Sequence, residues 1–134
     1  MKSTATWKKA LAFEGASDNG HTVPIDTTVA GGSLDSGMSP KQLVLAALCA
    51  CSGMDVVGIL DKMRVKYTQL EISAEAEQTT EHPRVFISIE MVYKTDVAPA
   101  DLDKLKKAID LSFTTYCGVL AMLKKHCPIT YTIA

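Results

Sequence analysis

The four cysteines of this sequence are the side chains best suited to chemistry, and two of them lie in one apolar run. Cys49 and Cys51 are separated by a single alanine in LVLAALCACSGMD, which covers residues 43–55. Residues two apart on a helix point about 200° apart, so these thiols cannot form a disulfide with each other within a helix. Cys51 precedes the small residues Ser52 and Gly53, which leave room for a substrate or a second backbone. We therefore predict Cys51 as reactive and Cys49 as core packing.

The other two cysteines differ in their position relative to predicted helix ends. Cys117 lies in TTYCGVLAML, in the first turn of a short helix, where the dipole and free N–H groups are expected to lower the pKa of a thiol. Gly118 leaves space beside its sulfur. Cys127 comes just past a helix end, where an anion is disfavoured, and is predicted to be structural. The candidate reactive pair is therefore Cys51 and Cys117.

A pair of thiols from two helices suits a two-cysteine peroxidase. One thiolate attacks a peroxide oxygen and becomes a sulfenic acid, which condenses with the second thiol to a disulfide that an external thiol reduces. Spacing alone leaves open the alternative that Cys51 and Cys117 are core thiols out of each other's reach.

A metal site is not predicted, although four potential ligands occur: Cys49, Cys51, His126 and Cys127. A Cys-x-Cys pair within a helix splays its sulfurs, and no pair has the Cys-x-x-Cys spacing of structural zinc sites. The remaining histidines, His21 and His82, fall in predicted turns and are interpreted as surface residues. We predict no cofactor.

Composition limits the class of protein. A chain of 134 residues predicts a single domain covering residues 1–134. The formal net charge of −1, with acidic and basic residues mixed, offers no basic patch for nucleic acid or a membrane surface. The N-terminus shows no secretory signal, and Ser52 and Asp55 interrupt the apolar run, so we expect a core helix rather than a membrane span. Four cysteines without a signal predict reduced thiols in the cytoplasm.

The chain pattern predicts an α+β fold. Short extended segments at 4–8, 11–16 and 21–27 precede a glycine-rich loop and a helix over 40–62, which Ser39 and Pro40 introduce. Because the first half of this helix is apolar on almost every face, we expect it to be buried on all sides, within a dimer core.

The second half of the chain predicts an antiparallel hairpin, two helices and a last strand. Residues 69–77 and 85–93 alternate between apolar and polar types, and 128–133 form the terminal strand. Thr114 or Thr115 is expected to cap the second, short helix. The apolar face of the first helix consists of Leu102, Leu105, Ile109 and Phe113.

Five stretches carry a resemblance to a known family, in order along nearly the whole chain: GHTVPID, SPKQLVLAALCACSGMDVVGILDKMR, ISAEAEQTTEHPRVFISIEMVY, KKAIDLSFTTYC and TYCGVLAML. They resemble the OsmC/Ohr family of organic-hydroperoxide and osmotic-stress proteins, in particular its YhfA-like branch. The resemblance implies antiparallel sheets that wrap a long central helix in an intertwined homodimer, with sites at the subunit interface. It also implies Cys51 as the peroxidatic and Cys117 as the resolving cysteine, organic hydroperoxides as substrates, and a lipoyl-type dithiol as reductant.

The sequence departs from the family pattern at the residues that activate the reactive thiol. Peroxidase members carry an N-terminal arginine held by a glutamate just after the helix-opening proline, but this chain has no arginine before Arg64 and has Lys41 after Pro40. Lysine lacks the planar fork of arginine. Asp55, one turn after Cys51, is predicted to make a polar contact or an ion pair with a lysine or arginine.

Two other functions remain compatible with the sequence. One is a non-enzymatic dimer that binds a hydrophobic small molecule or senses redox state, with a pocket lined by Leu43, Ala47, Met54 and Leu120. The other is thiol–disulfide exchange without peroxide, which needs only Cys51 and Cys117.

Overall fold

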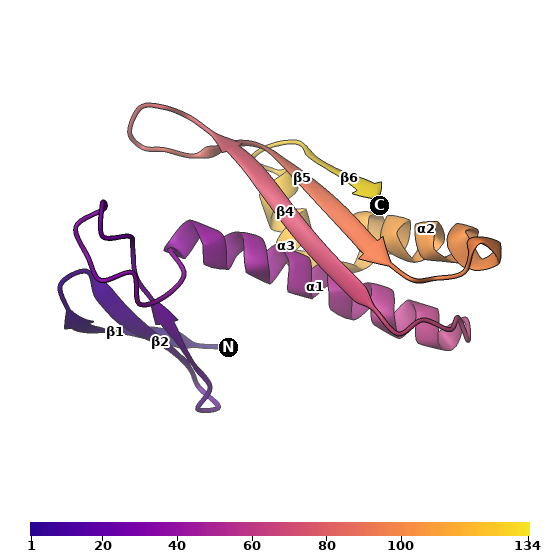
Figure 1. The fold of residues 1–134 in the computed structure, drawn as a ribbon, viewed down its shortest axis with the longest axis horizontal. Coiled ribbons are helices and arrows are strands. Elements are labelled where there is room, and N and C mark those ends of the chain that lie inside the picture. The colour runs from indigo at the N-terminus through magenta and orange to yellow at the C-terminus, as the bar shows by residue number, and fades with distance from the viewer. The chain divides into compact units, whose positions relative to one another are not determined.

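A computed structural model describes residues 1–134 and confirms the α+β class (Figure 1). The chain forms two compact units, Met1–Val44 and Leu45–Ala134. Each unit holds one three-stranded sheet, with strand order β1-β2-β3 in the first and β4-β5-β6 in the second.

The first unit is an antiparallel meander of β1 (Ser3–Lys9), β2 (Ala12–Ser17) and β3 (Thr22–Ile25). Gly20, with φ of 90°, supplies the left-handed residue of the predicted turn between β2 and β3. The following loop is held by the buried carboxylate of Asp26, which accepts hydrogen bonds from the Ser36 hydroxyl at 2.6 Å and the Thr27 N–H at 2.7 Å. Hydrogen bonds from Ser33 and Ser36 lower the pKa of Asp26 below its ordinary value.

The long helix α1 covers Pro40–Lys62, as predicted. Ser39 caps it: its Oγ accepts from the Gln42 N–H at 3.3 Å, and the Gln42 Oε1 accepts from the Ser39 N–H at 2.9 Å. This reciprocal pair is a capping box, which satisfies two backbone donors at once. Local sequence signals therefore account for where α1 begins.

Within a single chain only one stripe of α1 is fully buried, and burial of the remaining faces in a dimer core stays a prediction. The stripe consists of Leu48, Ser52, Val56 and Leu60. Apolar residues on other faces are exposed, with Met54 at 75% and Val57 at 44%. By length and composition alone, α1 is long and apolar enough to cross a membrane, which the sequence argument did not expect.

The second unit pairs β4 (Leu70–Gln78) with β5 (Phe86–Thr95) as the predicted antiparallel hairpin. The last strand, β6 (Ile129–Ile133), runs parallel to β5, so this sheet is mixed rather than wholly antiparallel. A register shift near Gln78 turns Ile87 outward, and Phe86 packs against the core instead.

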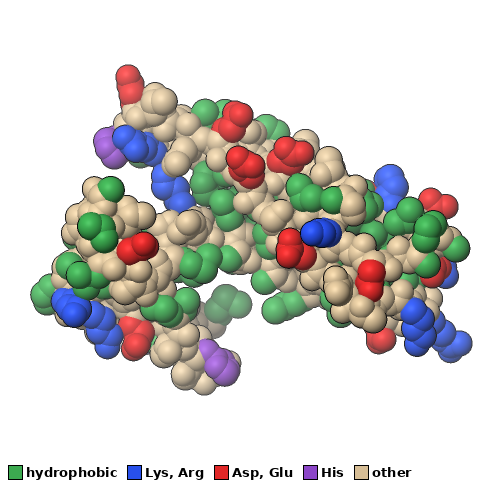
Figure 2. Space-filling view, viewed as in Figure 1, with side chains coloured by type: hydrophobic (Ala, Val, Ile, Leu, Met, Phe, Trp, Pro, Cys, Tyr) green, Lys and Arg blue, Asp and Glu red, His purple; other side chains and the backbone are tan.

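One face of this hairpin is acidic and faces solvent, while the other faces the core. Figure 2 shows acidic side chains gathered over β4 and β5. The exposed glutamates of the two strands are Glu71, Glu75, Glu77 and Glu90. The alternation that predicted a half-exposed strand is therefore confirmed for β4.

The helices between β5 and β6 differ in detail from the prediction. A 3₁₀ turn, η1 (Pro99–Asp101), precedes α2 (Leu102–Leu111), and a π-helical turn, η2 (Ser112–Tyr116), separates α2 from α3 (Gly118–Lys124). Leu102 is 41% exposed, and Ala108 takes part in the buried face with Leu105 and Ile109. Cys117, not a threonine, caps α3, because its sulfur accepts from the Leu120 N–H at 3.3 Å.

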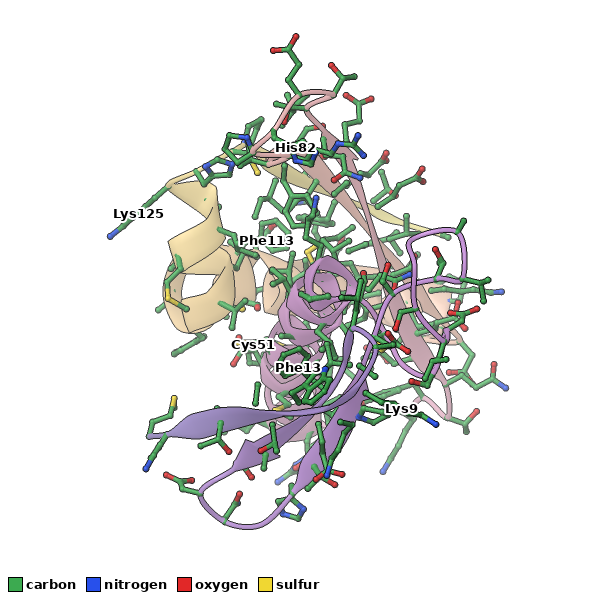
Figure 3. All side chains as sticks on the ribbon, turned by 90° about the vertical axis from the view of Figure 1, so that its left-hand side faces the viewer. Lys9, Phe13, Cys51, His82, Phe113 and Lys125 are labelled. Carbon is green, nitrogen blue, oxygen red and sulfur yellow. The ribbon has the colours of Figure 1, made fainter.

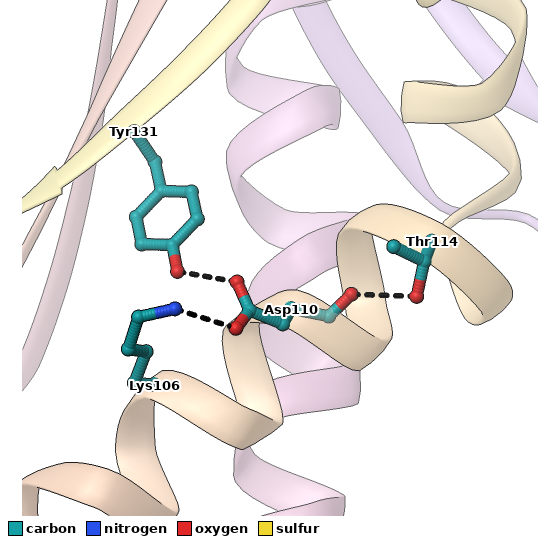
Figure 4. A network of polar contacts seen from close by, with 4 residues as sticks. All are labelled: Lys106, Asp110, Thr114 and Tyr131. Carbon is teal, nitrogen blue, oxygen red and sulfur yellow. Dashed lines mark hydrogen bonds and ion pairs between the residues drawn. The ribbon is translucent and has the colours of Figure 1, made fainter.

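A polar network ties α2 to the sheet (Figure 4). The Asp110 carboxylate accepts from the Tyr131 hydroxyl on β6 at 2.5 Å and from Lys106 Nζ at 2.8 Å. The Thr114 hydroxyl donates to the Asp110 carbonyl at 2.8 Å. These bonds anchor α2 and the π-turn that leads to Cys117.

Candidate functional site

The structure brings the thiols of Cys51 and Cys117 together within the second unit. Cys51 lies on α1 and is half-buried (Figure 3), whereas Cys117 is 3% exposed at the start of α3. The two side chains are close enough that hydrogen bonding with Cys51 is among the causes that change the pKa of Cys117. Residues far apart in the sequence thus form a dithiol with one accessible and one buried sulfur.

The pKa of Cys117 is raised to about 11, first by burial and then by hydrogen bonding with Cys51. The prediction of a lowered pKa is therefore wrong. The expected N–H group is present, since the Leu120 N–H donates to the sulfur and favours the thiolate. One such bond at the start of a seven-residue helix does not offset the loss of solvation around a buried sulfur.

The other two cysteines pack where structural residues were expected. Cys49 is half-buried against the hydrophobic core, and burial raises the pKa of its thiol. Cys127 is buried in the core beside the start of β6.

A chain of four polar side chains lies next to the dithiol, and the sequence analysis recognised only one of them. The Tyr93 hydroxyl lies 2.5 Å from Ser52 Oγ, which lies 2.9 Å from Ser112 Oγ. Ser112 Oγ in turn lies 2.9 Å from Asp55 Oδ2. Tyr93, Ser52 and Ser112 are fully buried, and burial raises the pKa of Tyr93 to about 12. A sequence signal did exist: Ser52 interrupts an otherwise apolar helix face.

Asp55 makes the polar contact that was one of its two predicted roles, because its carboxylate accepts a hydrogen bond from Ser112. The carboxylate is half-buried and one helical turn after Cys51. Its negative charge is one of the smaller causes of the raised pKa of Cys117.

The small residues after Cys51 allow close packing by other elements rather than leaving room for a substrate. Ser52 is buried in the hydroxyl chain, and a Cβ at Gly53 would lie 3.1 Å from the Ile72 side chain of β4. Glycine at 53 therefore allows α1 to pack closely on the sheet. Gly118, by contrast, has open space around its missing side chain, next to Cys117.

The histidines lie outside this site. His126 Nε2 lies 2.8 Å from the Phe86 carbonyl, and His21 and His82 are exposed in turns. No three His, Cys, Asp or Glu side chains form a group that could hold a metal ion.

An apolar pocket of about 540 Å³ lies within the first unit. Of the predicted pocket residues only Leu43 lines it, while Leu120 is fully buried in the core of the second unit. The full lining is Ala5, Leu11, Phe13, Ile25, Asp26, Thr27, Pro40 and Leu43.

Known proteins share both the sequence pattern and the architecture. The family model described as OsmC-like protein matches residues 32–132. Protein YhfA of Escherichia coli strain K12 is 34% identical over 132 residues, which cover 98% of this chain and 96% of the relative.

Two solved structures illustrate the similarity of fold. The OsmC like protein from Mycoplasma pneumoniae superposes with a TM-score of 0.82 at 15% identity, covering 99% of this chain and 94% of its own. The organic hydroperoxide resistance protein OhrB of Bacillus subtilis superposes with a TM-score of 0.68 at 18% identity, covering 99% of this chain and 96% of its own. At these identities the likeness concerns the fold.

Proposed function

This chain belongs to the OsmC-like protein family, and on that premise we propose that it is a thiol-dependent peroxidase that reduces organic hydroperoxides. Its fold is the OsmC/Ohr fold that the resemblance implied. The observation that carries the proposal is the pairing of half-buried Cys51 with buried Cys117. Cys51 would be the peroxidatic residue because its sulfur is the more accessible one, and Cys117 the resolving residue.

In the first step, the Cys51 thiolate attacks the terminal oxygen of the hydroperoxide. An S–O bond forms as the O–O bond breaks, and the alkoxide leaves and takes up a proton to become the alcohol. The sulfur loses two electrons and becomes a sulfenic acid. This step uses no metal or organic cofactor.

In the second step, the Cys117 sulfur attacks the sulfenic sulfur of Cys51. An S–S bond forms, the S–O bond breaks, and hydroxide leaves with the Cys117 proton as water. An external dithiol, proposed to be of the lipoyl type, then restores both thiols by two exchange reactions and is itself oxidised to a disulfide.

Oxidation of the wild-type protein tests this proposal. We expect one equivalent of tert-butyl hydroperoxide, added without reductant, to remove two hydrogen atoms from the intact mass, with peptide mapping showing a Cys51–Cys117 disulfide. Adding dihydrolipoamide should then support repeated consumption of the hydroperoxide. An unchanged mass, or a disulfide through Cys49 or Cys127, would refute the assignment.

A non-enzymatic binding role is the second candidate, and the apolar pocket of about 540 Å³ in the first unit favours it. The lack of an arginine before Arg64 points the same way, because the familiar thiolate-stabilising clamp is missing. The oxidation experiment with tert-butyl hydroperoxide distinguishes the two functions. A binding protein would take up an apolar ligand, but its intact mass would not fall by two hydrogen atoms and it would not consume hydroperoxide.

We also propose that the protein acts as a homodimer in the cytoplasm, with residues 1–134 as one domain. The family match crosses the boundary between the two compact units, which supports a single domain. The apolar residues exposed on α1 support a second copy as their cover.

We expect sedimentation velocity to give a particle of twice the 14.4 kDa chain mass. Met54→Lys, which places a charge on the exposed apolar face of α1, should shift the population to the single-chain mass, since burying an unpaired charge is costly. Met122→Lys, at another exposed methionine, is the matched control. A wild-type protein that sediments as a monomer at micromolar concentration would contradict the dimer.

A further inference from the structure

The buried hydrogen bond between Ser52 and Ser112 joins the two segments that carry the candidate redox pair. Ser52 directly follows Cys51 on α1, and its Oγ lies 2.9 Å from Ser112 Oγ. Ser112 begins the π-helical turn that ends just before Cys117. One side-chain hydrogen bond thus connects Ser52, the residue after Cys51, with the π-helical turn that leads to Cys117.

Ser112 also holds Cys117 through its backbone. The Cys117 N–H donates to the Ser112 carbonyl at 3.1 Å, which closes the π-turn. Single π-turns of this kind occur often at functional sites. Ser112 therefore makes two contacts at once. Its side chain bonds to Ser52 on α1, and its carbonyl accepts from the N–H of Cys117.

Ser112 is the shared donor of the hydroxyl chain, because its Oγ donates toward both Asp55 Oδ2 and Ser52 Oγ. Ser52 Oγ and the Tyr93 hydroxyl form the third hydrogen bond of the chain, in which either oxygen can donate. No buried side-chain polar atom is left without a partner, so removing the hydroxyl of either serine leaves a buried group unsatisfied.

The other anchors of this region do not reach α1. Asp110 ties α2 to Tyr131 of β6, and Lys124 Nζ donates to the Phe113 carbonyl at 3.3 Å. The hydroxyl chain, by contrast, directly joins the α2–α3 segment to the helix that carries Cys51.

We infer that Ser52 and Ser112 are positioning residues that hold Cys117 against Cys51 for disulfide formation, with Asp55 and Tyr93 as the outer hydrogen-bond partners of the two serines. This inference rests on the proposed function, because it concerns the step in which the Cys51 sulfenic acid condenses with Cys117 and releases water. Misplacement of reacting groups by about 1 Å can cost on the order of a hundredfold in rate. The residues therefore affect condensation and not the first attack on the peroxide.

Competition between two fates of the sulfenic acid measures this positioning. In excess cumene hydroperoxide without reductant, Cys51 either forms the disulfide, which loses two hydrogen atoms, or is oxidised further to the sulfinic acid, which gains two oxygen atoms. We expect Ser112→Ala to lower the ratio of disulfide to sulfinic acid by about tenfold to a hundredfold. The rate of sulfenic acid formation, followed by dimedone trapping, should stay within about twofold of wild type.

Three further variants separate positioning from a loss of stability. Ser112→Thr keeps the hydroxyl and should restore most of the ratio, while Ser52→Ala removes the other half of the same bond and should lower it. Val56→Ala, one turn after Ser52 on the same buried stripe, loosens α1 without touching the hydroxyl chain and should leave the ratio unchanged.

The outcomes distinguish this inference from the proposed function. If wild type forms no Cys51–Cys117 disulfide, the proposed function fails. If wild type forms it and both alanine variants at Ser52 and Ser112 keep the wild-type ratio, the positioning role is wrong. An equal loss in Val56→Ala would also overturn it, because the effect would then follow from general loosening.

Discussion

Cys51→Ser is expected to reduce hydroperoxide consumption to the rate without protein, a loss of at least about a thousandfold. A serine hydroxyl stays protonated near neutral pH and its oxygen cannot form a sulfenic acid, so neither step of the proposed cycle can begin. The substitution exchanges one atom on a half-buried side chain, so the fold should be retained. Loss of peroxide is followed colorimetrically with tert-butyl hydroperoxide and dihydrolipoamide.

Cys49→Ser is the matched control for this experiment. Cys49 lies two residues earlier on the same helix and is half-buried like Cys51, but it packs against the hydrophobic core. We expect this variant to keep activity within about threefold of wild type, because its thiol takes no part in the cycle. Equal activity of Cys51→Ser and wild type would remove the basis for the enzyme assignment.

Disulfide formation is expected to accelerate about hundredfold between about pH 7 and about pH 9, because Cys117 must ionise before it attacks. The pKa of Cys117 is about 11, so below that pH its thiolate fraction rises about tenfold for each pH unit. The negative charge of Asp55 is one of the smaller causes of this raised pKa, and Tyr93, whose own pKa is about 12, stays neutral over this pH range. A resolving thiol of this kind is slow at neutral pH.

Single-turnover acid-quench experiments measure this dependence. Wild type is mixed with one equivalent of hydroperoxide at each pH, and the disulfide is quantified by intact mass over time. Asp55→Asn keeps an oxygen that accepts from Ser112 but removes the negative charge, so it should lower the pKa of Cys117 and speed disulfide formation at neutral pH. A rate that levels off near neutral pH, or a slower Asp55→Asn variant, would contradict the raised pKa.

Sequence alone predicted those features whose causes lie within a few neighbouring residues. Ser39 and Pro40 mark the start of α1 because capping and the missing proline N–H act over one helical turn. The alternation along β4 marks its two faces because strand geometry repeats every two residues. Family resemblance supplied the overall fold that such local signals leave open, although not the parallel pairing of β6.

Tertiary structure alone decided the features that depend on what packs against a residue. Ser52 looked like open space in the sequence but is buried against Tyr93 and Ser112, which come from distant elements. The bulge that turns Ile87 outward and the parallel pairing of β6 depend in the same way on partner strands. No local pattern specifies such contacts.

The clearest case is Cys117, whose place at a helix start was predicted but whose pKa shifts in the opposite direction from the one expected. The helix N-terminus is a local feature, and the sulfur does accept the predicted N–H bond. The burial that outweighs this bond comes from packing with other parts of the chain, and the neighbouring thiol of Cys51 comes from another helix. Sequence therefore predicted the candidate redox pair, while desolvation by the folded chain decided how readily one of its two thiols ionises.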